Sequence, residues 1–365
     1  MTSIGHRLAS LSSHLSENSE SQMKIVVCRD LGPDVMPLLR SRSELEIVVW
    51  PHDRPSERKW LLDNINGATG LIVVFGEAVT PELLEAAGPN LRVVSTMSVG
   101  YEHIDLAAVA ARGIKVGYTP DVLTDAVADL SIMLALMASR NAGETMSLVQ
   151  SGHWPLHSWS PFGFCGPQLS SDGTTKPRTI GFLGFGRIAQ ATLARLIPFG
   201  VKHVIYTGSP SSPPTLERDQ ALAKEYKLDS ILRVDIAELA KESDVLFVLA
   251  PGGPKTRHIV NEEVLRKMKK TAILVNASRG TLVDSDALAK ALKEKWIWGA
   301  GIDVVEGEPK VGMDHCLVKE PRCVVLPHIG SATLETRLAM AALAAKNVLA
   351  GVFGEPLPSE LNLKS

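Results

Sequence analysis

The segment Thr179-Ile-Gly-Phe-Leu-Gly184-Phe-Gly186-Arg-Ile-Ala189 decides the fold, because an apolar strand runs straight into a glycine-rich turn and then a helix. Gly184 allows a tight turn, Gly186 lets backbone approach a pyrophosphate, and Ala189 permits close packing of helix on strand. The N-terminus of the helix expected over residues 188–197 offers N–H groups and a positive dipole end to an anion. Glycines alone also serve ordinary turns, but strand, turn and helix in this order predict a dinucleotide site.

Short β-rich runs alternate with helical ones on both sides of this segment, which is typical of parallel sheets covered by helices. The strands expected before it are Lys24–Cys28, Glu46–Trp50, Leu71–Phe75, Leu91–Ser95 and Ile114–Val116, with helices at Pro81–Ala87 and Ile104–Arg112. The strands expected from it onward are Thr179–Leu183, His203–Thr207, Asp244–Leu249, Ala272–Asn276, Gly299–Val304 and Cys323–Leu326. The pattern therefore predicts two α/β units.

Three further segments connect or close these units. A single long helix is expected over Ala126–Ser151, with an apolar face wide enough to join domains or to bury against a partner subunit. Residues 152–178 hold Trp154, Trp159 and several prolines and glycines, which predicts a long irregular loop. Residues 334–350 are alanine-rich and are expected to be helical.

Composition excludes several classes of protein. Of the 365 residues, 45% are hydrophobic and 21% charged, enough apolar content for two cores. Thirty-eight basic against 40 acidic residues give a net charge of −2, so no global basic field would hold nucleic acid or an anionic membrane. Four cysteines without CxxC spacing predict neither a disulfide framework nor a metal site, and they favour a reducing, cytoplasmic setting.

The first 22 residues differ from the rest of the chain. They hold seven serines, a single arginine (Arg7) and no acid before Glu17. We expect residues 1–22 to form a disordered extension. A mitochondrial address is the alternative, because transit peptides are Ser-rich, Arg-bearing and poor in acids.

The end of the second strand of the later unit bears on cofactor choice. NAD enzymes usually place an acid there for the ribose 2′-OH. Here the strand ends Tyr206-Thr207-Gly208-Ser209, and no acid follows before Glu217. The sequence therefore favours NADPH, with residues 207–209 around the 2′-phosphate and Arg187 or Arg218 close by. A solvated turn indifferent to both cofactors is the alternative, so NADH stays possible.

Polar side chains follow three of the expected strands. The segments are Asn276-Ala-Ser-Arg279-Gly280, Gly301-Ile-Asp303-Val-Val-Glu-Gly-Glu308-Pro309 and Pro327-His328-Ile-Gly330-Ser331. Ligands of open parallel sheets sit outside the carboxyl ends of the strands. An arginine, a carboxylate and a histidine could therefore converge beside a nicotinamide.

With Gly184–Ala189, these segments resemble the D-isomer-specific 2-hydroxyacid dehydrogenase family over nearly all of residues 23–365. The runs Ser95-Thr-Met-Ser-Val-Gly100, Val116–Asp125 and Gly354–Leu361 resemble its glyoxylate/hydroxypyruvate reductase subgroup in particular. The resemblance implies two doubly wound parallel-sheet domains, Rossmann-like or flavodoxin-like, with a cleft between them. Residues 23–122 and 334–365 would form the substrate domain, and residues 123–333 the NAD(P)-binding domain.

The resemblance also implies the catalytic roles. Arg279 would hold the substrate's carboxylate and keto oxygen, because its planar fork can donate two hydrogen bonds. His328 would be the general acid, and Glu308 would pair with it and favour its charged form. Glu306 is a rival, but the family's glutamate immediately precedes proline, as in Glu308-Pro309. The alternatives are structural: Arg279 could form only a surface salt bridge, and His328 could be a hydrogen-bonded residue with no catalytic role.

Further binding residues follow from the same resemblance. Asp303 would bind the nicotinamide carboxamide, unless it only caps a turn, and the backbone of Val99 and Gly100 would bind the substrate carboxylate, unless they form an ordinary turn. Two groups of residues would line the cofactor. Arg187 and Ile188 stand at the start of the helix that follows the glycine turn. Small residues at the ends of strands form the second group; they are Ala250, Pro251, Ala277 and Gly330.

The 152–166 loop resembles the subgroup's Trp-rich loop with altered spacing. It implies a homodimer in which Trp154 or Trp159 reaches toward the neighbour's substrate, although both could be interface packing only. At Ser209 the subgroup often has a basic residue, so serine weakens the case for NADPH.

The activity implied is NADPH-dependent reduction of hydroxypyruvate to D-glycerate and of glyoxylate to glycolate. A phosphoglycerate- or D-lactate-type NAD enzyme and a non-catalytic, NAD(H)-sensing corepressor-like protein are the alternatives. The sequence runs 37 residues past His328, so we expect no appended regulatory domain.

Overall fold

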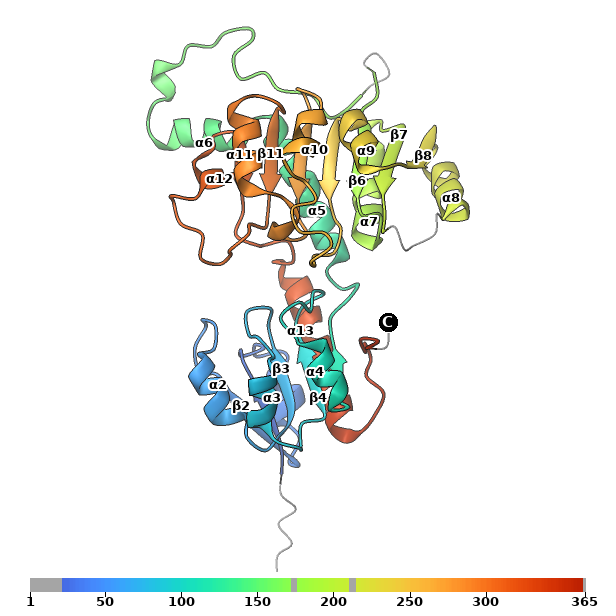
Figure 1. Cartoon of the computed structure of the whole chain (residues 1–365). Coiled ribbons are helices and arrows are strands. Elements are labelled where there is room, and N and C mark those ends of the chain that lie inside the picture. Colours follow the sequence, from blue (N-terminus) through green and yellow to red (C-terminus); the bar gives the residue numbers. More distant parts are fainter. Residues whose placement is uncertain (1–21, 172–175, 210–214, 364–365) are drawn as a thin grey trace, which may run out of the picture. The chain divides into compact units, whose positions relative to one another are not determined.

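The computed structural model describes residues 22–171, 176–209 and 215–363, and its chain divides into two compact units (Figure 1). Unit 1 comprises Met1–Thr119 and Ala341–Ser365, and unit 2 comprises Pro120–Met340. The sequence placed these divisions at 122/123 and 333/334, a few residues away from them. The predicted disorder of residues 1–22 falls, apart from Gln22, outside the described residues.

In the described part of unit 1, five parallel strands pair in the order β2-β1-β3-β4-β5. Their bounds are Met23–Val27 (β1), Leu45–Val49 (β2), Ala68–Val73 (β3), Val93–Thr96 (β4) and Lys115–Gly117 (β5). The helices are Met36–Arg40 (α1), Arg58–Ile65 (α2), Pro81–Ala87 (α3), Leu106–Ala111 (α4) and Leu334–Phe353 (α13), the last entering this unit at Ala341. This strand order is the flavodoxin-like form of the doubly wound fold.

Two neighbouring residues of β3 show how both faces of this sheet are covered. Leu71 belongs to the apolar core that α2, α3 and α4 form on one face. A Cβ at Gly70, which points to the opposite face, would lie 2.7 Å from Val348 and 2.8 Å from Val352 of α13. Glycine therefore lets α13 pack directly on the strand.

Unit 2 pairs seven described strands, all parallel, in the order β12-β11-β10-β9-β6-β7-β8 (Figure 1). The strands are Thr179–Leu183 (β6), His203–Thr207 (β7), Ser230–Arg233 (β8), Val245–Val248 (β9), Ile273–Asn276 (β10), Gly299–Ile302 (β11) and Cys323–Val325 (β12). The helices are Thr124–Ser139 (α5), Ala142–Gln150 (α6), Arg187–Leu196 (α7), Leu216–Tyr226 (α8), Ile236–Glu242 (α9), Glu262–Lys267 (α10), Ser285–Lys293 (α11) and Cys316–Lys319 (α12), with short 3-10 turns at Trp154–Leu156, Ile197–Phe199 and Gly280–Leu282.

Helices α5 and α7 pack on one face of this sheet, and α9, α10 and α11 pack on the other. The strand order changes direction between β6 and β9, which makes that point the topological switch where open α/β sheets bind ligands. The predicted α/β class, with two doubly wound parallel sheets, is therefore confirmed.

One prediction about local structure was wrong, and one strand was missed. The expected single helix over residues 126–151 is two helices, because the chain turns at Asn141, whose φ is +52°. Asparagine tolerates this left-handed conformation better than most residues, so it can end a helix inside an apolar pattern. Strand β8 was not predicted at all; it is short and pairs only with β7, and its Leu232 is exposed.

Among the described residues, only α13 is long and apolar enough to cross a membrane. Half of its apolar window is buried. Ala344, Ala345 and Val348 are completely buried, as expected of a helix that packs on a sheet.

Candidate active site

The turn between β6 and α7 is shaped to admit a ligand backbone. Gly184 has a φ of +86°, and a Cβ there would lie 2.8 Å from the Ala250 Cα. Gly186 precedes α7 without a capping side chain, and nothing lies within 4 Å of where its Cβ would be. Because the first N–H groups of a helix lack intrahelical partners, the start of α7 at Arg187 and Ile188 suits an anion. The residues present fit a dinucleotide pyrophosphate.

The ends of β9 and β10 lie beside this turn. Ala250 and Pro251 follow β9, and the Ser278 hydroxyl donates a hydrogen bond to the Ala250 carbonyl. Ala277, just past β10, packs partly buried against the apolar core under α5 and α7. Three adjacent strand ends thus form one edge next to the glycine turn.

An arginine of α8 lies near the last residues of β7, but in a cluster of its own. Tyr206 donates its hydroxyl to the buried Asp219 at 2.7 Å, and Arg218 pairs with the same carboxylate at 2.6 Å. The Arg218 guanidinium also lies 5.0 Å from the ring centre of Phe185. Burial and the neighbouring Asp219 raise the pKa of Tyr206. Asp219 therefore serves this cluster rather than a ribose hydroxyl.

Arg187, one of the two predicted phosphate partners, pairs with Asp121 at 2.7 Å.

Another arginine near β7, Arg233, was not predicted from the sequence. Arg233, at the end of β8, donates from Nη2 to the Ser209 carbonyl at 2.7 Å and lies beside Gly208. Because β8 was not predicted, nothing in the sequence pattern aligned Arg233 with the end of β7.

A buried asparagine shapes the turn that carries Arg279. The Asn276 side chain donates to the Arg279 carbonyl at 2.9 Å and accepts from the Ser278 N–H at 3.1 Å. A Cβ on Gly280 would lie 2.2 Å from the Val305 carbonyl carbon, so only glycine allows this contact. The Arg279 segment is thereby pressed against the loop that leads to the two candidate glutamates.

The two candidate glutamates have different partners. Glu308 Oε1 lies 2.7 Å from His328 Nδ1, and both side chains are partly exposed. Glu306 instead lies 2.6 Å from His258 Nε2 and pairs with Arg257. The hydrogen bond from His258 and the pair with Arg257 lower the pKa of Glu306. The geometry therefore joins Glu308, and not Glu306, to the candidate acid.

Asp303 anchors the segment that carries His328. Its two carboxylate oxygens accept the N–H groups of Ile329 and Gly330, each at 2.7 Å, and its carbonyl accepts the His328 N–H at 2.8 Å. His328 is held at a φ of +55°. Burial raises the pKa of Asp303. Asp303 thus caps this turn, the structural alternative for it, and its contact with nicotinamide stays a prediction.

The remaining predicted residues are Val99 and Gly100 in unit 1 and the two tryptophans in unit 2. Val99 and Gly100 follow β4 in unit 1, where the Ser98 hydroxyl donates to the Gly100 carbonyl at 2.6 Å. Trp154 and Trp159 belong to unit 2 and are 64% and 88% exposed, so neither is part of its core. Their roles stay predictions.

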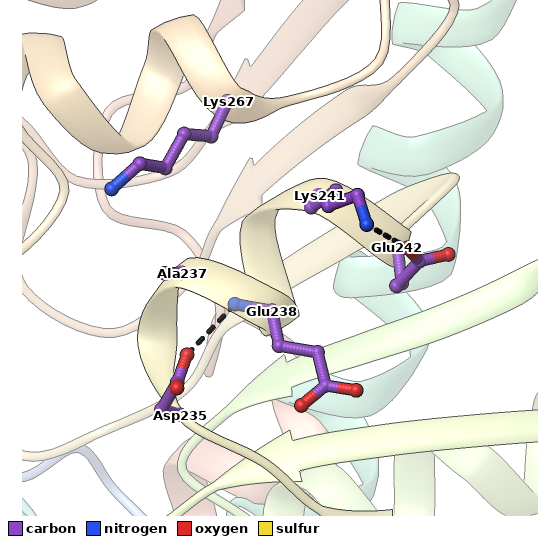
Figure 2. Close-up of a pocket in the computed structure, with 6 residues that line it drawn as sticks. All are labelled: Asp235, Ala237, Glu238, Lys241, Glu242 and Lys267. Carbon is purple, nitrogen blue, oxygen red and sulfur yellow. Dashed lines mark hydrogen bonds and ion pairs between the residues drawn. The ribbon is translucent and has the colours of Figure 1, made fainter.

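A separate hollow of about 490 Å³ in unit 2 lies between α9 and α10 (Figure 2). It is lined by Asp235, Ala237, Glu238, Lys241, Glu242 and Lys267. None of the motif residues borders it, and its open, charged walls offer no apolar seat for a nicotinamide ring. No group of three or more side chains suited to hold a metal ion occurs among the residues that the structure describes.

Unit 2 therefore joins a doubly wound sheet, a glycine turn at its switch point and a histidine–carboxylate pair at its carboxyl edge. These features define a dinucleotide-binding protein of the Rossmann class. The model of the D-isomer specific 2-hydroxyacid dehydrogenase NAD-binding domain matches residues 132–330, more than half of the chain. The chain belongs to this family, whose members are oxidoreductases that act on CH–OH groups, and the resemblance inferred from sequence is confirmed.

Several relatives are similar over almost their whole length. The human "Glyoxylate reductase/hydroxypyruvate reductase" is 41% identical over 93% of this chain and 98% of its own. "Glyoxylate reductase" of Thermofilum pendens is 40% identical over 93% of this chain and 94% of its own. A crystal structure of the NADPH-dependent glyoxylate/hydroxypyruvate reductase from Sinorhizobium meliloti, in complex with NADP and malonate, superposes with a TM-score of 0.75 at 30% identity, covering 94% and 98% of the chains.

Proposed function

We propose that this protein reduces small 2-oxo acids with NADPH, converting hydroxypyruvate to D-glycerate and glyoxylate to glycolate. The 2.7 Å contact between His328 and Glu308 in the dinucleotide-binding unit carries the proposal, because it is the constellation of a general acid with its orienting carboxylate. The names of the relatives supply the substrate class.

The contact between His328 and Glu308 supports the first of the proposed roles, and the family resemblance supports that of Arg279. A bound cofactor would supply hydride from its nicotinamide to the carbonyl carbon of the 2-oxo acid. His328, held through Nδ1 by Glu308, donates a proton from Nε2 to the carbonyl oxygen as negative charge develops there. Arg279 binds the substrate carboxylate and orients the carbonyl. The products are the 2-hydroxy acid and the oxidised cofactor, so one proton and one hydride are consumed.

Substrate and cofactor are tested together. Purified protein is mixed with NADPH or NADH and a panel of glyoxylate, hydroxypyruvate, pyruvate and phosphohydroxypyruvate, and absorbance at the nicotinamide band is followed. We expect the first two acids with NADPH to give the highest kcat/KM. A preference for NADH, or for another acid, would refute the corresponding half of the proposal. No oxidation with any pair would favour a non-catalytic, nucleotide-sensing protein.

The protein is further proposed to act as a homodimer in the cytoplasm. Large apolar side chains of α5, α6 and the 152–166 loop are exposed, and such a surface is typical of an interface. They are Met133, Leu136, Met146, Val149, Trp154, Leu156, Trp159, Phe162 and Phe164. Light scattering should give twice the chain mass of 39.3 kDa. A stable monomer would contradict the dimer.

A further inference from the structure

The pairing of β7 with β8 brings a cation to the turn that would hold the adenosine ribose. The two strands run in register from His203 with Ser230 to Tyr206 with Arg233. The Thr207 hydroxyl then donates to the Val234 carbonyl at 2.9 Å, which extends the contact past the strand ends. Arg233 is therefore fixed beside residues 207–209.

The guanidinium lies against this turn. Arg233 Nη2 donates to the Ser209 carbonyl at 2.7 Å, and its Cζ lies 3.7 Å from the position of a Cβ on Gly208. In doubly wound dinucleotide-binding units, the ribose 2′ position sits at the end of the second strand, which here is β7. We infer that Arg233 is the residue that selects NADPH, through its charge on the 2′-phosphate; this rests on the proposed function.

The charges around this turn agree with that role. The sequence from Gly208 to Leu216 holds no acid that would repel a phosphate. The first acid after Arg233 is Asp235, whose carboxylate caps α9 by accepting the Glu238 N–H at 2.8 Å. A guanidinium suits a phosphate because its planar fork can donate two charge-assisted hydrogen bonds.

The two arginines expected from sequence are committed elsewhere. Arg187 pairs with Asp121, and Arg218 pairs with Asp219 and lies over the rings beside it. The turn itself has an uncharged serine at position 209. The cation for the 2′-phosphate thus comes from Arg233 on the neighbouring strand.

The test compares two nucleotides that differ only in the 2′-phosphate. Adenosine 2′,5′-bisphosphate and 5′-AMP are titrated by calorimetry into the full-length wild type, Arg233→Ala and Lys241→Ala, a surface cation of α9 used as a matched control. Arg233→Ala should weaken the bisphosphate by about 10- to 100-fold, the loss expected for hydrogen bonds to a charged group, and leave 5′-AMP unchanged. Lys241→Ala should change neither.

Kinetics provide the second readout. In Arg233→Ala the KM for NADPH should rise by a similar factor while the kinetics with NADH stay unchanged. Equal weakening of both nucleotides would mean that Arg233 only braces the turn through Ser209, and no weakening of either would also overturn the inference. A wild type that binds the bisphosphate but reduces neither acid would refute the proposed function and leave the Arg233 assignment standing.

Discussion

His328→Ala should lower turnover with hydroxypyruvate by about 10²- to 10⁴-fold, the contribution typical of a positioned general acid. The ring lies at the end of a turn that Asp303 holds through the backbone, and those bonds do not involve the imidazole. Cofactor binding should therefore survive. Single-turnover absorbance measures the chemical step, and quenching of tryptophan fluorescence by NADPH measures binding. Turnover near the wild-type value would discard His328 as the acid.

Two glutamates provide a matched pair for the same prediction. Glu308→Ala removes the carboxylate that holds the His328 ring through Nδ1, so turnover with hydroxypyruvate should fall by about 10- to 100-fold while the affinity for NADPH is kept. Glu306→Ala breaks the contacts with His258 and Arg257 and leaves the His328 contact in place, so its turnover should match the wild type. A loss of turnover in Glu306→Ala but not in Glu308→Ala would reverse the assignment.

Strands buried on both faces were the most predictable part of the fold. The predicted bounds of β6 and β7 coincide with the observed ones, because a parallel strand buried on both faces is a continuous apolar run between turns. Strand β8 has an exposed face and one neighbour, so it leaves only a weak pattern. The break at Asn141 depends on one left-handed residue inside an apolar stretch, which periodicity does not register.

The candidate site follows the same rule. Sequence placed Arg279, Glu308 and His328 each just past a strand, and parallel topology alone brings such positions to one edge. The pattern of residues alone did not separate Glu306 from Glu308, because that choice depends on which carboxylate the loop turns toward His328; the choice of Glu308 came from the resemblance at Glu308-Pro309. Arg233 was missed because its place depends on a pairing between strands that begin 27 residues apart, His203 with Ser230. The sequence therefore predicted what depends on local pattern, but not what depends on the register between distant strands.

Arg279→Gln should lower kcat/KM for hydroxypyruvate by about 10²- to 10⁴-fold, because two hydrogen bonds to a charged carboxylate contribute roughly 1.5–3 kcal/mol each. Arg279→Lys restores the charge without the planar fork, so its loss should be intermediate and appear mainly in KM. Neither change should alter the affinity for NADPH.

If Arg279 had a structural role instead, its replacement would lower the stability of the protein. A substitution at the neighbouring Asn276 shows what such a loss of stability looks like. The turn is held by Asn276, which is 1% exposed and bonds both the Arg279 carbonyl and the Ser278 N–H. Asn276→Ala should therefore lower the free energy of unfolding by about 1–3 kcal/mol, the cost of leaving buried backbone groups without partners. Arg279→Gln leaves both of these bonds to the backbone in place, and should leave the unfolding midpoint in urea nearly unchanged. If Arg279→Gln destabilises the protein as much as Asn276→Ala, Arg279 is a brace of the turn rather than the group that binds the substrate.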